Sequence, residues 1–130
     1  MIDIVKFVDQ CYNKLPASLK NCPWVATDHG RALLQTEEQL DAYLAAYGEM
    51  HIVKCKAALQ NFPCTKPEDD INRHNFEIFD WGCGQGIATL TLLDFLRERG
   101  LLGRLNRITL IGNMHQSSAH IRPTGAGFRI

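Results

Sequence analysis

Apolar residues recur at helical spacing in two segments of the N-terminal half of the chain. The first stripe covers residues 2–14 and stops before Pro16, whose ring cannot continue a helix. The second follows a capping-box pattern, in which the side chains of Thr36 and Gln39 can each accept a hydrogen bond from the other's backbone amide. Its apolar positions recur in steps of three and four up to about residue 60, just before a proline. These patterns predict an N-terminal helical region over residues 1–63.

The second half of the chain changes to a strand–helix–strand pattern. Residues 64–75 are polar and rich in turn-forming residues, which predicts a linker. Residues 76–80 form a short apolar strand, and after a glycine-rich loop an apolar helix covers about residues 87–96. A second apolar strand follows at residues 108–111. This order predicts an α/β fold with one βαβ unit over residues 76–111.

The loop between the first strand and the helix predicts a ligand site. The start of a helix presents free backbone amides, and Gly82, Gly84 and Gly86 leave room for a ligand to approach them. A dinucleotide-binding loop has the spacing Gly-x-Gly-x-x-Gly, but Ile87 stands where the third glycine would fall. Asp80, two residues before the first glycine, suits a cationic ligand better than a pyrophosphate. No Gly-Lys-Ser/Thr sequence follows, so the loop is not a phosphate-binding P-loop.

The segment Phe76-Glu77-Ile78-Phe79-Asp80-Trp81-Gly82-Cys83-Gly84-Gln85-Gly86 closely resembles motif I of the class I S-adenosylmethionine-dependent methyltransferases. The resemblance implies a partial Rossmann-like methyltransferase fold with S-adenosylmethionine as cofactor. In the family, the acid of this motif helps to hold the aminoacyl part of the cofactor, and the glycine backbone packs against it. The resemblance assigns no catalytic residue, and Cys83 and Gln85 occupy variable positions. The predicted cofactor-binding residues are Asp80, Gly82, Cys83, Gly84, Gln85 and Gly86.

The chain departs from the family after the second strand. Members of the family usually have an acid at the end of that strand, which accepts hydrogen bonds from the cofactor's ribose, whereas this chain has Gly112 and Asn113. Residues 112–130 show neither a helical stripe nor strand alternation, so we expect an irregular tail. We hypothesise that the tail is not native to the fold and results from truncation or a shifted reading frame. The strand at 108–111 would then be an exposed edge through which the protein self-associates.

Composition narrows these expectations further. Hydrophobic residues make up 45% of the 130 residues and charged residues 22%, no apolar run is long enough to cross a membrane, and no signal peptide is recognisable. We therefore expect a cytoplasmic protein. The odd number of cysteines, five, with no Cys-x-x-Cys pair, argues against a zinc site or a disulfide framework, and we expect no metal.

Residues 99–130 contain five arginines and no acid. A basic segment can contact nucleic acid, but we favour an atypical surface composition as its cause.

The leading functional hypothesis is therefore a fragment or truncated form of an S-adenosylmethionine-dependent methyltransferase that is inactive alone. Its methyl acceptor could be RNA, a protein or a small molecule, because the part of the family fold that selects the acceptor is absent. One alternative is a non-catalytic α/β interaction module with a degenerate cofactor loop. Another is a fragment of an NAD-dependent oxidoreductase, which the glycine spacing disfavours.

Overall fold

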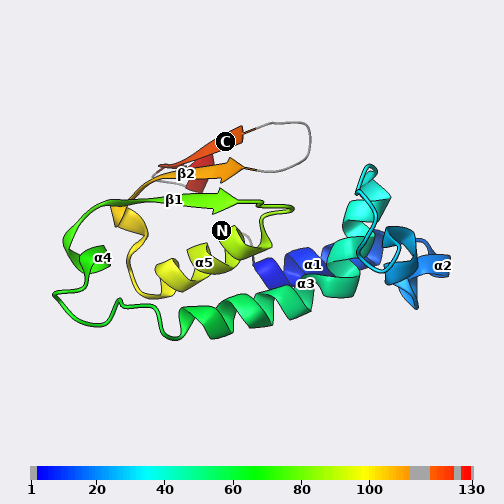
Figure 1. Ribbon diagram of the computed structural model, residues 1–130, viewed down its shortest axis with the longest axis horizontal. Helices are drawn as coiled ribbons and strands as arrows, with labels where there is room; N and C mark the ends of the chain where they lie inside the picture. The colour runs from blue at the N-terminus through cyan, green and yellow to red at the C-terminus, as the bar shows by residue number, and fades with distance from the viewer. Residues whose placement is uncertain (1–2, 112–117, 125–126, 130) are drawn as a thin grey trace. The chain divides into compact units, whose positions relative to one another are not determined.

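The computed structural model describes residues 3–111, 118–124 and 127–129. The chain divides into two compact units, one over residues 2–54 and the other from Cys55 onward. The first unit is helical, and the second combines helices with a sheet (Figure 1). Among the described residues, no helix combines the length and the apolar character that a membrane span requires.

The first unit begins with helix α1, Ile4–Lys14, which confirms the first predicted helix. Asp3 caps it, because its carboxylate accepts hydrogen bonds from the amides of Val5 at 3.0 Å and Lys6 at 3.3 Å. The helix buries Ile4, Val8 and Cys11 on one face. Two short helices follow, between the two predicted helices: α2, Ala17–Lys20, and the 3-10 helix η1, Pro23–Thr27.

Helix α3, Glu37–Leu59, confirms the second predicted helix and its capping box. The Gln39 amide donates to the Thr36 hydroxyl at 3.1 Å, and the Gln39 side-chain oxygen accepts from the Thr36 amide at 3.3 Å. In the first five turns of α3, the most deeply buried residues lie on a helix face next to the face that carries the apolar residues of the sequence pattern. These positions are Asp41, Ala42, Leu44, Gly48 and Ile52.

Gly48 has a packing role inside α3. A Cβ atom at this position would lie 2.9 Å from one methyl carbon of Val8 and 3.2 Å from the other. Glycine in a helix interior costs about 1 kcal/mol relative to alanine. In this structure the missing side chain allows α1 and α3 to approach each other closely, since Val8 fills the space.

The second unit contains the predicted βαβ arrangement. Strand β1, Phe76–Trp81, is followed by helix α5, Ile87–Glu98, the 3-10 helix η2, Leu102–Arg104, and strand β2, Leu105–Ile111. β1 and β2 are parallel, with Ile78 opposite Ile108 and Trp81 opposite Ile111. The polar segment before β1 also contains a one-turn helix, α4, Asp70–Arg73, which the linker prediction did not include. An α/β fold is thus confirmed, while the finer Rossmann-like assignment stays a prediction.

Only one side of β1 is covered by α5. The residues of β1 alternate between half-buried and exposed, as expected for a strand with one face on a core. Phe76 and Ile78 pack against buried residues of α5 and β2. Figure 1 shows α5 lying along this side of the two parallel strands. On the other side, Phe79 is 53% exposed and Trp81 is 76% exposed.

The expectation of an irregular tail is wrong for the C-terminal residues that the structure describes. Strand β3, Ser118–Thr124, pairs antiparallel with β2, and strand β4, Gly127–Arg129, pairs antiparallel with β3. The sheet order is β1-β2-β3-β4, so β2 is an internal strand and is not the exposed edge that we expected. The physical reason is that the backbone groups of Ile108–Ile111 pair with β3, whatever the side-chain pattern of the tail. Gly112 and Asn113 lie outside the described residues.

Candidate functional site

The glycine loop joins the end of β1 to the start of α5 in a conformation that requires glycine. Gly82, Gly84 and Gly86 have φ angles of 70°, 50° and 80°, in the left-handed region that other residues rarely adopt. A Cβ atom built on any of the three would meet no atom of the described residues within 4 Å. Backbone conformation, and not crowding, therefore selects glycine here, and the space beside each residue is open to a ligand.

The loop is attached to the end of the second strand. The amides of Gly82 and Cys83 both donate to the carbonyl oxygen of Ile111, at 2.6 Å and 3.1 Å. The Gly86 amide donates to the Cys83 carbonyl oxygen at 2.7 Å, which closes the turn before α5. These bonds hold the loop at the carboxyl ends of both parallel strands, where α/β proteins bind their ligands.

Several hydrogen-bond donors of the loop have no acceptor among the described residues. Within the part of the chain that the structure describes, the amides of Gly84 and Gln85 donate to no group, and the buried side-chain nitrogen of Gln85 has no partner. No side chain caps α5. Its first hydrogen bond runs from the Leu90 amide to the Gly86 carbonyl oxygen at 2.9 Å, so the amides of the preceding turn lack a helical partner. Together these donors and the positive end of the helix dipole attract an anionic group.

Asp80 lies next to these donors at the end of β1, on the side of the strand that α5 covers. Its side chain is half-buried, and its carboxylate accepts a hydrogen bond from the hydroxyl of Thr89 in the first turn of α5. The Thr89 side chain is buried. Thr89 is not recognisable as a site residue from the sequence, because a threonine nine positions after an acid has no specific spacing signal. Only the fold of the βαβ unit brings the strand end and the first helical turn together.

The surroundings of Cys83 in this loop disfavour the thiolate form of its side chain. Burial raises its pKa above the ordinary value, and the negative charge of Asp80 raises it further. The thiol therefore stays protonated at neutral pH, whereas the thiolate is the reactive form. Cys83 contributes its backbone to the turn, because its carbonyl oxygen accepts from the Gly86 amide and its amide donates to the Ile111 carbonyl oxygen.

The six predicted cofactor-binding residues lie together at the end of β1 and in the loop that follows, and the structure adds Thr89 and the carbonyl of Ile111 to them. The acid expected after the second strand has no substitute within the described residues. Among those residues, no three His, Cys, Asp or Glu side chains cluster as ligands of a metal ion would. The free amides of the loop offer a site for an anion, and the carboxylate of Asp80 offers a neighbouring site for a cation. No protein-family model, curated protein or solved structure matches the chain.

Proposed function

We propose that residues 76–111 bind S-adenosylmethionine as the cofactor half of a class I methyltransferase. The observation that carries the proposal is that two kinds of group lie side by side. Hydrogen-bond donors without an acceptor lie at Gly84, Gln85 and the start of α5, and the carboxylate of Asp80 lies next to them. The complete relative would transfer a methyl group to RNA, a protein or a small molecule.

The charges of the ligand fit those of the loop. The aminoacyl part of S-adenosylmethionine carries a carboxylate and an ammonium group, and its sulfonium supplies an activated methyl group. The carboxylate suits the free amides at the start of α5. The ammonium suits Asp80, which Thr89 holds in place by its hydrogen bond. A dinucleotide would instead bring its pyrophosphate close to Asp80, where the two negative charges repel each other.

Calorimetry with the wild-type chain and two glycine variants tests the proposal. Gly84→Val introduces a branched side chain where φ is 50° and the ligand needs space, so binding of S-adenosylmethionine should disappear. Gly100→Val is the matched control, because Gly100 also has a positive φ, of 69°, a Cβ there meets no atom within 4 Å, and it lies outside the loop. Equal affinity of the wild type and Gly84→Val would refute the pocket. Tighter binding of NAD than of S-adenosylmethionine would favour the oxidoreductase alternative.

A non-catalytic interaction module remains the second candidate, and one observation favours it. Phe79 and Trp81 expose two aromatic side chains on the face of β1 that α5 does not cover. Exposed apolar patches on stable proteins often mark interaction surfaces. Absence of any cofactor binding in the calorimetric test, with the fold intact by circular dichroism, would support this candidate.

A further inference from the structure

β1 is an open edge of the sheet. It pairs with β2 on one side, and no other described strand pairs with it on the opposite side. Edge strands are usually protected by lysine, proline or a bulge in mid-strand. Phe76–Trp81 contains neither lysine nor proline, and its only register shift lies at its first step, between Phe76 and Glu77. The backbone groups along most of this edge are therefore available to another strand.

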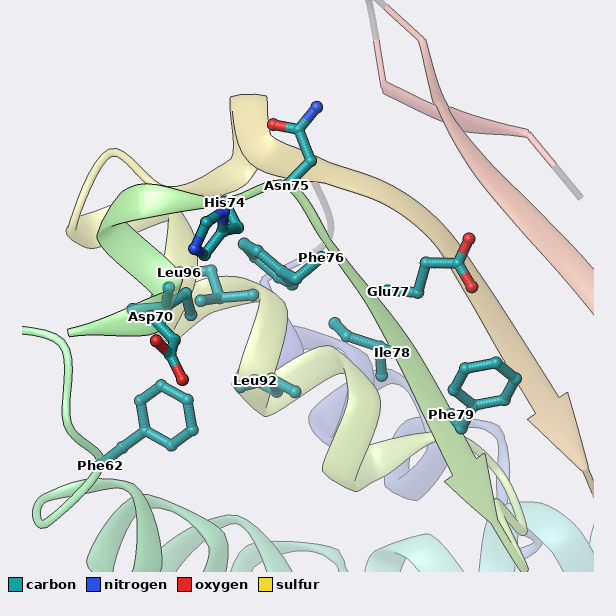
Figure 2. A pocket seen from close by; sticks show the side chains of 11 residues that line it. Phe62, Asp70, His74, Asn75, Phe76, Glu77, Ile78, Phe79, Leu92 and Leu96 are labelled. Carbon is teal, nitrogen blue, oxygen red and sulfur yellow. The ribbon is translucent and has the colours of Figure 1, made fainter.

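A cavity of about 470 Å³ lies beside this edge (Figure 2). Its walls come from β1, α4, α5 and Phe62, and no residue of β2 lines it, so it lies on the side of β1 away from β2. The lining is mainly apolar. The apolar residues of the lining are Phe62, Ile71, Phe76, Ile78, Phe79, Leu92 and Leu96. An added strand would thus find both hydrogen-bonding groups and a cavity for an apolar side chain.

The charged groups around the cavity select the partner's charge. Asp70 and Glu77 line it, together with His74, and no lysine or arginine of residues 3–111 does. Glu77 is already paired with Arg107, at 3.0 Å. The exposed carboxylate of Asp70 makes no hydrogen bond or ion pair within the described residues. Asp70 therefore favours a cationic side chain close to the edge.

We propose that the open edge of β1 and this cavity bind an extended peptide segment of another protein, in which apolar residues alternate with lysine or arginine. The segment adds a strand to the sheet through main-chain hydrogen bonds. One apolar side chain enters the cavity, and a basic side chain reaches Asp70. A second copy of β1 fits less well, because Phe76–Trp81 carries two acids and no basic residue and would bring carboxylates toward Asp70.

The test uses the full chain and two labelled seven-residue peptides, one of alternating valine and lysine and one of alternating valine and glutamate. Fluorescence anisotropy should show binding of the valine–lysine peptide, and the valine–glutamate peptide should bind at least about fivefold more weakly. Hydrogen exchange should slow at the amides of Phe76–Trp81 when the first peptide is added. The amides of Ile108–Ile111, which lie in a stretch paired with β1 on one side and β3 on the other, serve as the internal reference.

Charge reversal locates the binding site without disturbing the core. Asp70→Lys should weaken binding of the valine–lysine peptide about fivefold. Glu68→Lys, the matched control, makes the same change two residues away at an exposed position that does not line the cavity, and should have little effect. Equal binding of both peptides, equal effects of the two variants, or unchanged exchange in β1 would overturn the proposal. Concentration-dependent dimerisation that protects β1 without peptide would also overturn it, in favour of a second copy as the occupant.

Discussion

The hydroxyl of Thr89 donates a hydrogen bond to the carboxylate of Asp80. This bond joins the first turn of α5 to the last residues of β1, directly beside the glycine loop. It fixes the orientation of a half-buried charge before any ligand arrives. Preorganisation of this kind reduces the cost of ordering a site when the ligand binds.

Replacement of Thr89 should therefore affect stability and cofactor binding together. Thr89→Val keeps the shape of the side chain but removes the donor, and we expect a loss of about 1–3 kcal/mol in the free energy of unfolding, measured by urea denaturation. Affinity for S-adenosylmethionine should also fall, because Asp80 is no longer held in position.

Thr91→Val provides the control for that change. The Thr91 side chain is equally buried, but its hydroxyl donates at 2.8 Å to the carbonyl of Ile87 within the same helix, a local bond that adds little to stability. Its unfolding free energy should change by less than about 1 kcal/mol. Equal losses in the two variants would show that the bond to Asp80 has no special role.

Gly48→Ala should destabilise the N-terminal unit even though alanine favours helix formation. The added methyl group would lie 2.9 Å from a methyl carbon of Val8. Overpacking of this kind costs about 1–3 kcal/mol, against a gain of about 1 kcal/mol in helix propensity. Adding Val8→Ala to the variant should restore part of the loss, because it makes room for the methyl group. Thermal unfolding that shows a more stable single variant would contradict the packing of α1 against α3.

The buried thiol of Cys11 should make stability depend on alkaline pH. Burial, with a smaller contribution from its hydrogen bond to Asp41, raises the pKa of this thiol from 9.0 to about 11. The thiol is protonated in both states below pH 9, so the stabilisation is fully present there. As the pH rises from 9 to about 11, the unfolded state loses its proton first, and about 2–3 kcal/mol of stability is lost.

Comparison with Cys11→Ala isolates this contribution from other groups that titrate in the same range. The free energy of unfolding of the wild type should fall more steeply between pH 9 and 11 than that of the variant. Parallel pH profiles for the two proteins would mean that the thiol titrates normally in the folded state.

Removal of residues 112–130 should expose β2 as a new edge. Hydrogen exchange should accelerate at the amides of Ile108–Ile111, which pair with β3 in the full chain, and sedimentation should detect stronger self-association. Exchange in α1 serves as the reference, because that helix belongs to the other compact unit. A shortened chain that is as stable and as monomeric as the full chain would support the hypothesis that the tail is foreign to the fold.

The elements with strong local signals were predictable from the sequence. The capping box at Thr36 and Gln39 forms both of its hydrogen bonds, and the strand, loop and helix around Gly82–Gly86 lie where the periodicity places them. These features depend on residues within a few positions of one another, so a short sequence pattern contains the necessary information.

Features that depend on backbone pairing or on distant residues were not predictable. β3 and β4 each pair with the strand directly before them through backbone groups, which the side-chain pattern of residues 118–129 does not reveal. The bond between Thr89 and Asp80 requires the helix to fold back on the strand. The buried face of α3 likewise depends on where Val8 meets Gly48, so the apolar stripe in the sequence indicated a neighbouring face.

The carbonyl oxygen of Ile111 accepts bonds from two amides almost thirty residues earlier in the chain. The glycine loop therefore lacks two of its anchoring contacts until β2 has been synthesised and has docked beside β1. During translation, the ribosome must release the whole strand–helix–strand segment before the loop is held in its final form. Closure of such a distant contact is slower than local helix formation. We therefore expect ligand-binding competence to appear late in folding, after α5 has formed, as a kinetic signature of this loop.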